Sequence, residues 1–261
     1  MITVKVPAKI NLTLDITGVM GGYHLLDSII VPVNLFDTVR VDFNDGSEVS
    51  CKGIDVPDIS NTACKAARLM MEEYGLPGAA IEIAKGIPFS GGLGGSTADG
   101  VAVIKAYERR FGLKASAQTV ARLASDAPAM YAERAVRVNG RGEKVAPVGI
   151  EVRHKILLKV AEGGVDTARC YAEYDASEGK STAYTAEVLK EGIFRPSKAG
   201  NALHEAAARL NGNIGKVTDE MFALGAEAAY VTGSGSGVIG FFGRIPENLP
   251  EEFISLEIKT I

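Results

Sequence analysis

Hydrophobic and polar residues alternate in short stretches of the N-terminal part of the chain. In one stretch, Ile10, Leu12, Leu14 and Ile16 stand at every second position. A period of two places such side chains on one face of an extended backbone, so the alternation predicts a half-buried strand. On this basis we expect strands at residues 2–6, 10–16, 38–43 and 80–84.

A helical period takes over within residues 61–74, where small and hydrophobic side chains recur at three- and four-residue intervals. Gly75 follows directly, as is typical of the residue that ends a helix. Ser116 is suited to be the N-cap of a later helix because its hydroxyl can accept from a backbone N–H. The other predicted helices cover residues 97–111, 116–124, 167–175, 181–191, 198–211 and 213–225.

The second half of the chain has short strands among its helices. These strands are predicted at residues 155–160, 228–232, 238–242 and 253–260. Strands with two helices come first and a helix-rich part with a small sheet follows, so the order indicates an α+β fold and not a regularly alternating α/β fold. We expect two domains, at residues 1–150 and 151–261.

Composition and charge exclude several classes of protein. The chain has 261 residues, 46% of them hydrophobic, which suffices for a buried core without disulfide or metal cross-links. Its net charge of −4 argues against a nucleic-acid-binding protein, which normally carries a basic excess. No apolar run is long enough for a membrane helix, and no signal-peptide pattern stands at the N-terminus. The three cysteines, Cys51, Cys64 and Cys170, fit a reducing cytosol, so we expect a cytoplasmic protein without a metal site of its own.

Glycine, with 30 residues, is more frequent than usual and gathers in short clusters. The strongest cluster follows a predicted strand and leads into the helix at residues 97–111. Unpaired N–H groups and a partial positive charge at a helix start attract anions, and glycines let the backbone approach them closely. We interpret the cluster as a phosphate-binding loop, against the alternative of a flexible loop with a Ser/Thr N-cap. Its candidate residues are Pro88, Gly91, Gly92, Leu93, Gly94, Gly95, Ser96 and Thr97.

Two better-known phosphate-binding patterns do not fit this chain. A Walker A loop needs a glycine before its Gly-Lys-Ser, but Tyr174 stands at that position ahead of Gly179-Lys180-Ser181, which we interpret as a turn that enters a helix. The dinucleotide pattern G-x-G-x-x-G, counted from Gly92, would need a glycine where Thr97 stands. A Rossmann domain is therefore not expected.

Two N-terminal stretches carry polar residues that could act on a ligand. Lys9 and Asn11 stand at the mouth of a strand patterned for burial. Lys9 is either a solvated edge residue or a fixed cation for a phosphoryl group or an activated hydroxyl. Tyr23 and His24 follow two glycines in a predicted loop, where packing is the simpler alternative to binding.

Two further stretches are open to more than one interpretation. Asp126, followed by Ala-Pro after a short helix, is commonly part of a turn but is also a candidate catalytic carboxylate. The glycine and serine residues at 233–237 predict a hairpin, or a close approach of the backbone to the phosphate loop or the substrate.

Taken together, Pro7-Ala8-Lys9-Ile10-Asn11-Leu12, the glycine loop without a Walker lysine and Gly233-Ser234-Gly235-Ser236-Gly237 resemble the three motifs of the GHMP small-molecule kinases. Further stretches resemble those members that phosphorylate a cytidine diphosphate sugar alcohol. They are residues 22–26, 61–69, 125–128, 140–144, 164–168 and 201–203. The resemblance implies a two-domain α+β fold, with a ribosomal-protein-S5-like N-terminal domain and a ferredoxin-like C-terminal domain.

The resemblance also implies roles on the ATP side. The ATP phosphates would lie over the glycine loop, and Asn61 and Lys85 match positions that line the adenine side. Asp126 matches the catalytic aspartate, which takes the proton of the acceptor alcohol, and Lys9 matches the partner lysine, which stabilises the developing charge. Mg²⁺ would come with the nucleotide, with Ser96 as a contact and without a dedicated carboxylate cage.

On the acceptor side, the resemblance assigns five residues to the substrate. Tyr23 would stack on cytosine, His24 would contact the edge of the base, and Tyr171 would offer a second stacking face. Asn11 would position the polyol, and Gly235 would lie against the substrate.

The activity implied is ATP-dependent phosphorylation of the 2-hydroxyl of the sugar alcohol in the non-mevalonate pathway to isoprenoid precursors. We expect a small-molecule substrate, no nucleic acid or membrane partner, and a monomer or homodimer. A kinase of another small alcohol and a silent nucleotide-binding member are the alternatives, and the presence of both Lys9 and Asp126 argues against the silent one. The chain departs from the family pattern at residues 96–98, 129–134 and 160–162, which leaves the acceptor open.

Overall fold

The computed structural model describes residues 1–54, 57, 59–177 and 182–259. The chain divides into two compact units, each made of separate segments. Unit 1 comprises Met1–Ala8, Leu35–Ile87 and Gly94–Glu133, and unit 2 comprises Lys9–Asn34, Pro88–Leu93 and Arg134–Ile261. The predicted turn at Gly179-Lys180-Ser181 lies outside the described residues. The domain boundary at residue 150 stays a prediction.

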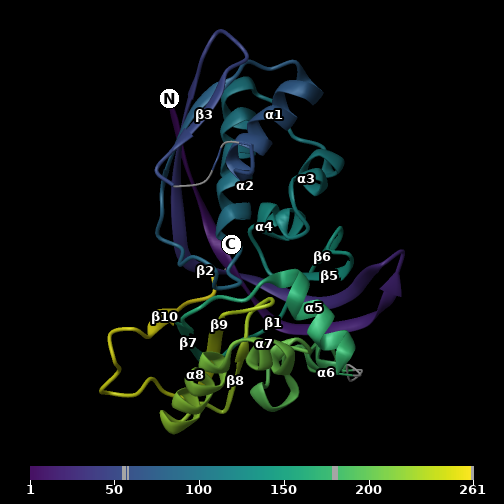
Figure 1. The fold of residues 1–261 in the computed structure, drawn as a ribbon, viewed down its shortest axis with the longest axis vertical. Coiled ribbons are helices and arrows are strands. Elements are labelled where there is room, and N and C mark those ends of the chain that lie inside the picture. Colours follow the sequence, from purple (N-terminus) through teal and green to yellow (C-terminus); the bar gives the residue numbers. More distant parts are fainter. Residues whose placement is uncertain (55–56, 58, 178–181, 260–261) are drawn as a thin grey trace. The chain divides into compact units, whose positions relative to one another are not determined.

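Figure 1 shows helices and strands in both units, in the order in which the chain forms them. The strands are β1 (Ile2–Met20), β2 (Tyr23–Phe43), β3 (Val49–Lys52), β4 (Ala79–Ala84), β5 (Val136–Gly140), β6 (Lys144–Pro147), β7 (Lys155–Val160), β8 (Ala228–Val231), β9 (Gly237–Phe242) and β10 (Ile254–Leu256). The helices are α1 (Thr62–Tyr74), α2 (Gly95–Phe111), α3 (Ala117–Leu123), α4 (Ala127–Ala132), α5 (Thr167–Ala176), α6 (Tyr184–Glu191), the 3₁₀ helix η1 (Pro196–Lys198), α7 (His204–Leu210) and α8 (Gly212–Ala223). This content confirms the α+β fold.

The sheet of unit 1 is built around β4. Residues 38–43 of β2 pair with it antiparallel, and β3 pairs with its other edge in parallel. Ala79, Ile81 and Ile83 of β4 are buried while the residues between them are more exposed, as the sequence alternation predicts.

Helices α1 and α2 lie side by side in unit 1 (Figure 1). Asn61 caps α1 with its Oδ1, which accepts from Ala63 N at 2.9 Å, and Gly75 ends the helix in the left-handed conformation. A Cβ at Gly100 of α2 would lie 3.0 Å from Thr62, so the glycine permits the close approach of the two helices. The first turns of α1 and α2 are thereby held next to each other.

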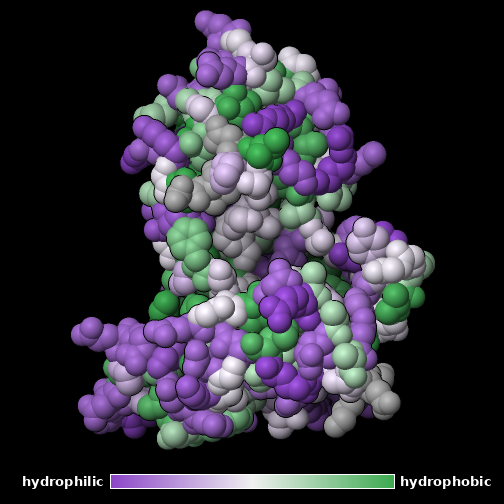
Figure 2. Space-filling view, viewed as in Figure 1, coloured by the Kyte–Doolittle hydropathy of each residue, from purple (hydrophilic) through white to green (hydrophobic). Residues whose placement is uncertain are grey.

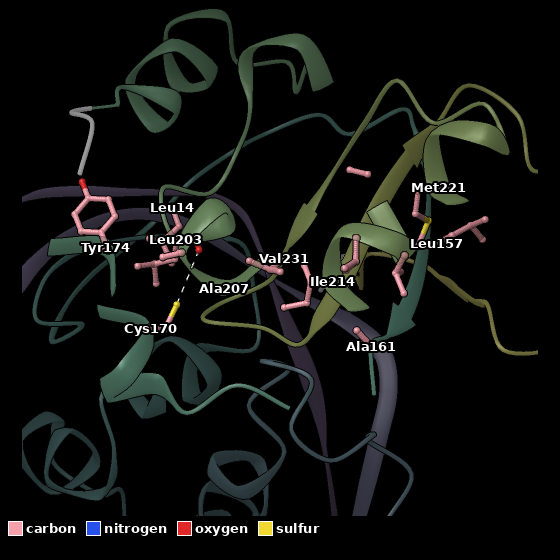
Figure 3. Close-up of a cluster of buried hydrophobic side chains, with 14 of the residues drawn as sticks. Leu14, Leu157, Ala161, Cys170, Tyr174, Leu203, Ala207, Ile214, Met221 and Val231 are labelled. Atoms are coloured by element: carbon pink, nitrogen blue, oxygen red, sulfur yellow. Dashed lines mark hydrogen bonds between the residues drawn. The ribbon is translucent and has the colours of Figure 1, made fainter. Parts of the chain in front are cut away.

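Unit 2 contains two groups of paired strands. Residues 26–30 of β2 pair antiparallel with β5, which pairs with β6. A separate four-stranded antiparallel sheet has the order β10-β7-β9-β8. A hydrophobic cluster joins this sheet to β1 and to helices α5, α7 and α8, with Leu157, Cys170, Leu203, Ile214 and Val231 among its members (Figure 3).

Hydrophilic residues dominate the visible surface over α8 and the segment between β9 and β10 (Figure 2). The same helix turns Ile214, Val217 and Met221 into the cluster, so it separates a polar from an apolar side in the usual way. In the part of the chain that the structure describes, we find no helix with the length and hydrophobicity needed to span a membrane.

The N-terminal strands differ from the sequence prediction in extent. β1 is one long strand where two were predicted, because Pro7, Ala8 and Lys9, which separate the two predicted stretches, are buried and continue the extended backbone. Tyr23 and His24 begin β2, so their predicted placement in a loop is wrong. The turn before them contains only Gly21 and Gly22, both with positive φ.

Other differences have local causes. The predicted helix at residues 198–211 is divided, because Asn201 forms a bridge to β1 and donates to the carbonyl oxygens of Val231 and Gly233. The predicted turn after Asp126 leads into α4, whose first turn contains Pro128. The short strands β3, β5 and β6 were not predicted.

Candidate active site

Segments from all three motifs meet at Lys9 in unit 2. Its backbone N donates to the carbonyl oxygen of Leu93 in the glycine loop at 3.0 Å. Its buried side chain donates from Nζ to Asn11 Oδ1 at 2.9 Å. A Cβ at Gly233 would lie 3.4 Å from the same Nζ. The ammonium group is therefore fixed beside the third motif, and the alternative of a solvated edge lysine is wrong.

Asn11 organises this meeting point. Its Oδ1 accepts from Lys9 Nζ, from Gly233 N at 3.0 Å and from the Thr232 hydroxyl, and its Nδ2 donates to Ser28 Oγ at 2.8 Å. The side chain thus orients the lysine and the turn after β8. Its expected contact with the polyol stays a prediction.

The turn between β8 and β9 packs its backbone onto the glycine loop. A Cβ at Gly92 would collide with the carbonyl oxygen of Thr232, and a Cβ at Gly237 would collide with that of Gly91. β8 and β9 are antiparallel neighbours. Residues 233–237 therefore form the predicted hairpin turn and also approach the glycine loop closely, while their approach to the substrate stays a prediction.

Ser236 ties this turn to two neighbours. Its N donates to the carbonyl oxygen of Ser90 at 2.8 Å, and its hydroxyl donates to that of Ala161 at 2.7 Å. Ala161 N donates back to the carbonyl oxygen of Ser236 at 3.1 Å. Gly235, with φ 89, lies in the same turn, and its contact with substrate stays a prediction.

The start of α2, in unit 1, continues the glycine loop. Gly94 caps the helix in the left-handed conformation and has no side chain to occupy the space before the first turn. Ser96 Oγ lies 3.2 Å from Thr62 Oγ1, and Thr97 is buried. The backbone N–H groups of a first helical turn have no partner within the helix, so this end is suited to bind an anion.

Lys85 lies next to this helix start, between two buried carboxylates. A Cβ at Gly95 would be 3.3 Å from its Nζ. Lys85 donates to Asp37 and, at 3.0 Å, to Asp99 Oδ2. Asp37 also accepts from the backbone N of Gly86 and Ile87 at 2.8 and 2.9 Å. The two carboxylates hold the lysine in one position next to the first turn of α2.

Two buried polar atoms of unit 1 have no hydrogen-bond partner among the described residues: Asn61 Nδ2 and Asp99 Oδ1. Asn61 precedes Thr62 and Asp99 precedes Gly100, the two residues at the close contact of α1 with α2. A buried donor and a buried acceptor without partners are costly, so their presence points to a ligand that supplies the complementary atoms.

Burial raises the pKa of Asp99 from 3.8 to about 7, with a further contribution from Asp37, while Lys85 opposes the shift. The folded chain therefore holds a proton that the unfolded chain has released over this range, so stability should fall as the pH rises from about 4 to about 7. Asp99→Asn should remove this component and flatten the pH dependence of the melting temperature. Melting curves across this range, with the exposed Asp219→Asn as control, test it. Equal declines in the wild type and the Asp99 variant would contradict it.

Asp126, in unit 1, stands directly before α4. Its side chain is half-buried and does not cap the helix, although its carbonyl oxygen accepts from Met130 N at 3.0 Å. Residues 129–132, in one of the stretches that depart from the family pattern, belong to α4. The catalytic role of Asp126 stays a prediction.

Two of the residues assigned to the base are in contact in unit 2. The His24 ring stacks on Tyr171, with ring centroids 4.7 Å apart and planes at 27°. His24 Nε2 lies 2.8 Å from Asp175 Oδ1, and Tyr174 meets the same ring edge-on. Helix α5 therefore supplies three of the neighbours of His24.

Tyr23 precedes this cluster on β2. Its side chain is 59% exposed, and the Arg141 guanidinium lies over the ring at 4.3 Å from its centroid. A ring this exposed contributes little to a hydrophobic core, but its contact with Arg141 is itself packing, so a binding role for Tyr23 stays a prediction.

The candidate residues are shared between the two units. Unit 1 holds Asn61, Lys85, Gly94, Gly95, Ser96, Thr97 and Asp126, and unit 2 holds Lys9, Asn11, Tyr23, His24, Pro88, Gly91, Gly92, Leu93, Tyr171 and Gly235. Asp37, Asp99, Arg141 and Asp175 were not predicted as site residues. Asp99 could have been found from its place directly after the glycine loop, whereas Asp37 has no local signal. A pocket of about 690 Å³ in unit 2, next to β7 and His154, contains none of these residues.

The comparisons with known proteins agree with these motifs. The model of the GHMP kinases N terminal domain matches residues 61–142. The fold and the motifs thus define a GHMP kinase, which confirms the resemblance found in the sequence.

Relatives that match most of the chain show which GHMP kinases it is most similar to. The chain is 31% identical over 250 residues to the 4-diphosphocytidyl-2-C-methyl-D-erythritol kinase of Bacillus subtilis (strain 168), covering 90% of this chain and 86% of the relative. It is 32% identical over 279 residues to the same kinase of Clostridium botulinum (strain Alaska E43 / Type E3), covering 99% of both. A crystal structure of 4-(cytidine 5'-diphospho)-2C-methyl-D-erythritol kinase superposes with a TM-score of 0.77 at 28% identity, covering 92% of this chain and 90% of that one. The chain belongs to the family of 4-diphosphocytidyl-2-C-methyl-D-erythritol kinases.

Proposed function

We propose that the chain transfers the γ-phosphoryl group of ATP to the 2-hydroxyl of 4-diphosphocytidyl-2-C-methyl-D-erythritol, in the non-mevalonate pathway. The observation that carries the proposal is the meeting of the three motifs in unit 2, where Lys9 contacts both the glycine loop and Asn11. The names of the relatives supply the acceptor. Two domains, at residues 1–150 and 151–261, and a cytoplasmic monomer or homodimer belong to the same proposal.

The phosphates are assigned to the glycine loop and to the start of α2. Support comes from Gly94, whose left-handed backbone opens the helix without a side chain, and from the unpaired N–H groups of the first turn. Within the described residues, no three His, Cys, Asp or Glu side chains are grouped to hold a metal ion. Mg²⁺ in kinases is held largely by the substrate phosphates, and Ser96 is the residue that we assign to it.

The adenine side is assigned to Asn61 and Lys85, to which we add Asp99. Asn61 Nδ2 is a buried donor, and Asp99 Oδ1 is a buried acceptor above about pH 7, where the carboxyl group is ionised; neither has a partner among the described residues. Adenine offers ring nitrogens that accept and an amino group that donates. This complementarity supports the assignment.

The chemical roles follow from the reaction. Bound ATP would supply the phosphoryl group, and Mg²⁺ would partly neutralise the negative charge of the phosphates. Asp126 takes the proton of the 2-hydroxyl as the hydroxyl oxygen forms its bond to the γ-phosphorus, while the bond from that phosphorus to the bridging oxygen breaks and ADP leaves. Lys9 stabilises the negative charge on the oxygens of the transferring group. The fixed position of its buried ammonium supports this role, since a preorganised cation needs no rearrangement during the reaction.

The cytidine end is assigned to Tyr23, His24 and Tyr171, with Asn11 and Gly235 toward the polyol. Two of the three rings are already in contact, at 4.7 Å between the centroids of His24 and Tyr171.

Tyr23→Ala should raise the KM for the cytidyl substrate by roughly 5- to 150-fold and barely change the KM for ATP. An aromatic stack on a base contributes about 1–3 kcal/mol, and the lost contact lies away from the reacting hydroxyl. Steady-state kinetics with both substrates varied measure this. Phe222→Ala, which removes another exposed aromatic ring, is the control and should leave both constants unchanged. Equal losses for ATP and acceptor would count against the cytidyl assignment.

A further inference from the structure

Asp175 holds His24 from one side, and the proposed function gives it no role. Its Oδ1 lies 2.8 Å from His24 Nε2. Tyr171, which stacks on the same imidazole, stands one helical turn earlier on α5. Side chains four positions apart share one face of a helix, so the two contacts fix both the plane and one edge of the ring.

The helix that presents Asp175 is anchored in the core through a neighbouring face. Cys170 and Tyr174 of α5 are buried in the hydrophobic cluster of unit 2 (Figure 3). Asp166 caps the start of the helix by accepting from Arg169 N at 2.8 Å. The packing of α5 therefore fixes the position of Asp175 next to His24.

This contact decides which ring nitrogen of a neutral His24 carries the proton. A neutral imidazole has one N–H donor and one acceptor nitrogen, and the partner of one nitrogen sets the state of the other. An ionised carboxylate can only accept, so Nε2 keeps the proton and donates it to Asp175. Nδ1 is left as an acceptor, and no described residue donates to it.

We propose that Asp175 is a positioning residue that makes His24 selective for a base with an amino group at its edge. The inference rests on the proposed function, in which His24 contacts the edge of the base. Cytosine presents an amino donor at the position where uracil presents a carbonyl acceptor. As an acceptor, Nδ1 binds the amino group of cytosine. With uracil, Nδ1 would face a carbonyl oxygen, and the two acceptors would repel each other. Without Asp175 the proton can move to Nδ1, and the preference is lost.

The test compares the binding of CDP and UDP by calorimetry at about pH 8, above the range where histidine normally titrates. The wild type should prefer CDP, and Asp175→Ala should lower the ratio of the two affinities by about tenfold. Asp175→Asn should keep most of the preference, because its Oδ1 can still accept from Nε2. Glu227→Ala is the matched control: it removes the carboxylate 3.2 Å from His154 Nε2, another histidine pair of unit 2, and should leave the ratio unchanged.

Heteronuclear NMR of the imidazole nitrogens gives a readout that does not depend on activity. The proton of His24 should be on Nε2 in the wild type and should redistribute in Asp175→Ala. If the wild type prefers CDP, two results would overturn this inference and leave the proposed function standing. One is an unchanged CDP-to-UDP affinity ratio in Asp175→Ala, and the other is a wild-type proton on Nδ1. A wild type that binds neither CDP nor UDP would overturn both.

Discussion

Asp126→Asn should lower kcat by roughly 100-fold or more while ATP binding stays nearly unchanged. The amide has the shape of the carboxylate but cannot take a proton from the acceptor hydroxyl. The backbone of Asp126 opens α4 by accepting from Met130 N, and its side chain makes no capping hydrogen bond, so α4 should still form in the variant.

Single-turnover rates and nucleotide titrations on the same preparation separate the two effects. Asp45→Asn, an exposed carboxylate of unit 1, is the matched control and should retain full turnover. A variant at Asp126 that keeps most of its turnover would remove this residue from the mechanism, whatever the fate of ATP binding.

Gly95→Val should abolish measurable ATP binding in a protein that remains folded, and Gly94→Val should do the same by straining a left-handed backbone. A Cβ at Gly95 would lie 3.3 Å from Lys85 Nζ and 3.3 Å from the Ile87 side chain, and the two methyl groups of valine extend further. They would displace the lysine or fill the space that we assign to the phosphates.

Calorimetry with ATP and a melting curve measure binding and folding separately. Gly215→Val in α8 is the matched control, because a Cβ at that helical glycine meets nothing within 4 Å. Wild-type ATP affinity in folded Gly95→Val would mean that the loop is not the phosphate site.

Much of the fold could be predicted because most elements follow local rules. Residues 155–160 form the predicted strand, and the predicted caps at Gly75 and Ser116 are present in α1 and α3. Prediction failed where distant contacts override the local pattern. Pro7 and Lys9 look like a break between two strands, because the carbonyl oxygen of Leu93, which accepts from Lys9 N in the folded chain, lies far away in the sequence.

The candidate site shows the same division between local and distant signals. The local sequence predicts the glycine loop, because four glycines stand close together in it. Its close approach to residues 233–237 was one of two predicted alternatives. Asp37 could not be found, because its relation to Lys85 exists only after β2 and β4 have paired. Asp175 looks like an ordinary surface residue until α5 is formed and places it one turn from Tyr171.

The central claim is that this chain phosphorylates the cytidyl alcohol and not another one. It is tested by coupled ADP release, measured with ATP, Mg²⁺ and a panel of alcohols that includes 4-diphosphocytidyl-2-C-methyl-D-erythritol, mevalonate and homoserine. We expect rapid ADP release with the cytidyl substrate alone, stoichiometric with a product phosphorylated at the 2-hydroxyl. Release with another alcohol and none with the cytidyl substrate would contradict the acceptor assignment, and no release with any alcohol would contradict the kinase.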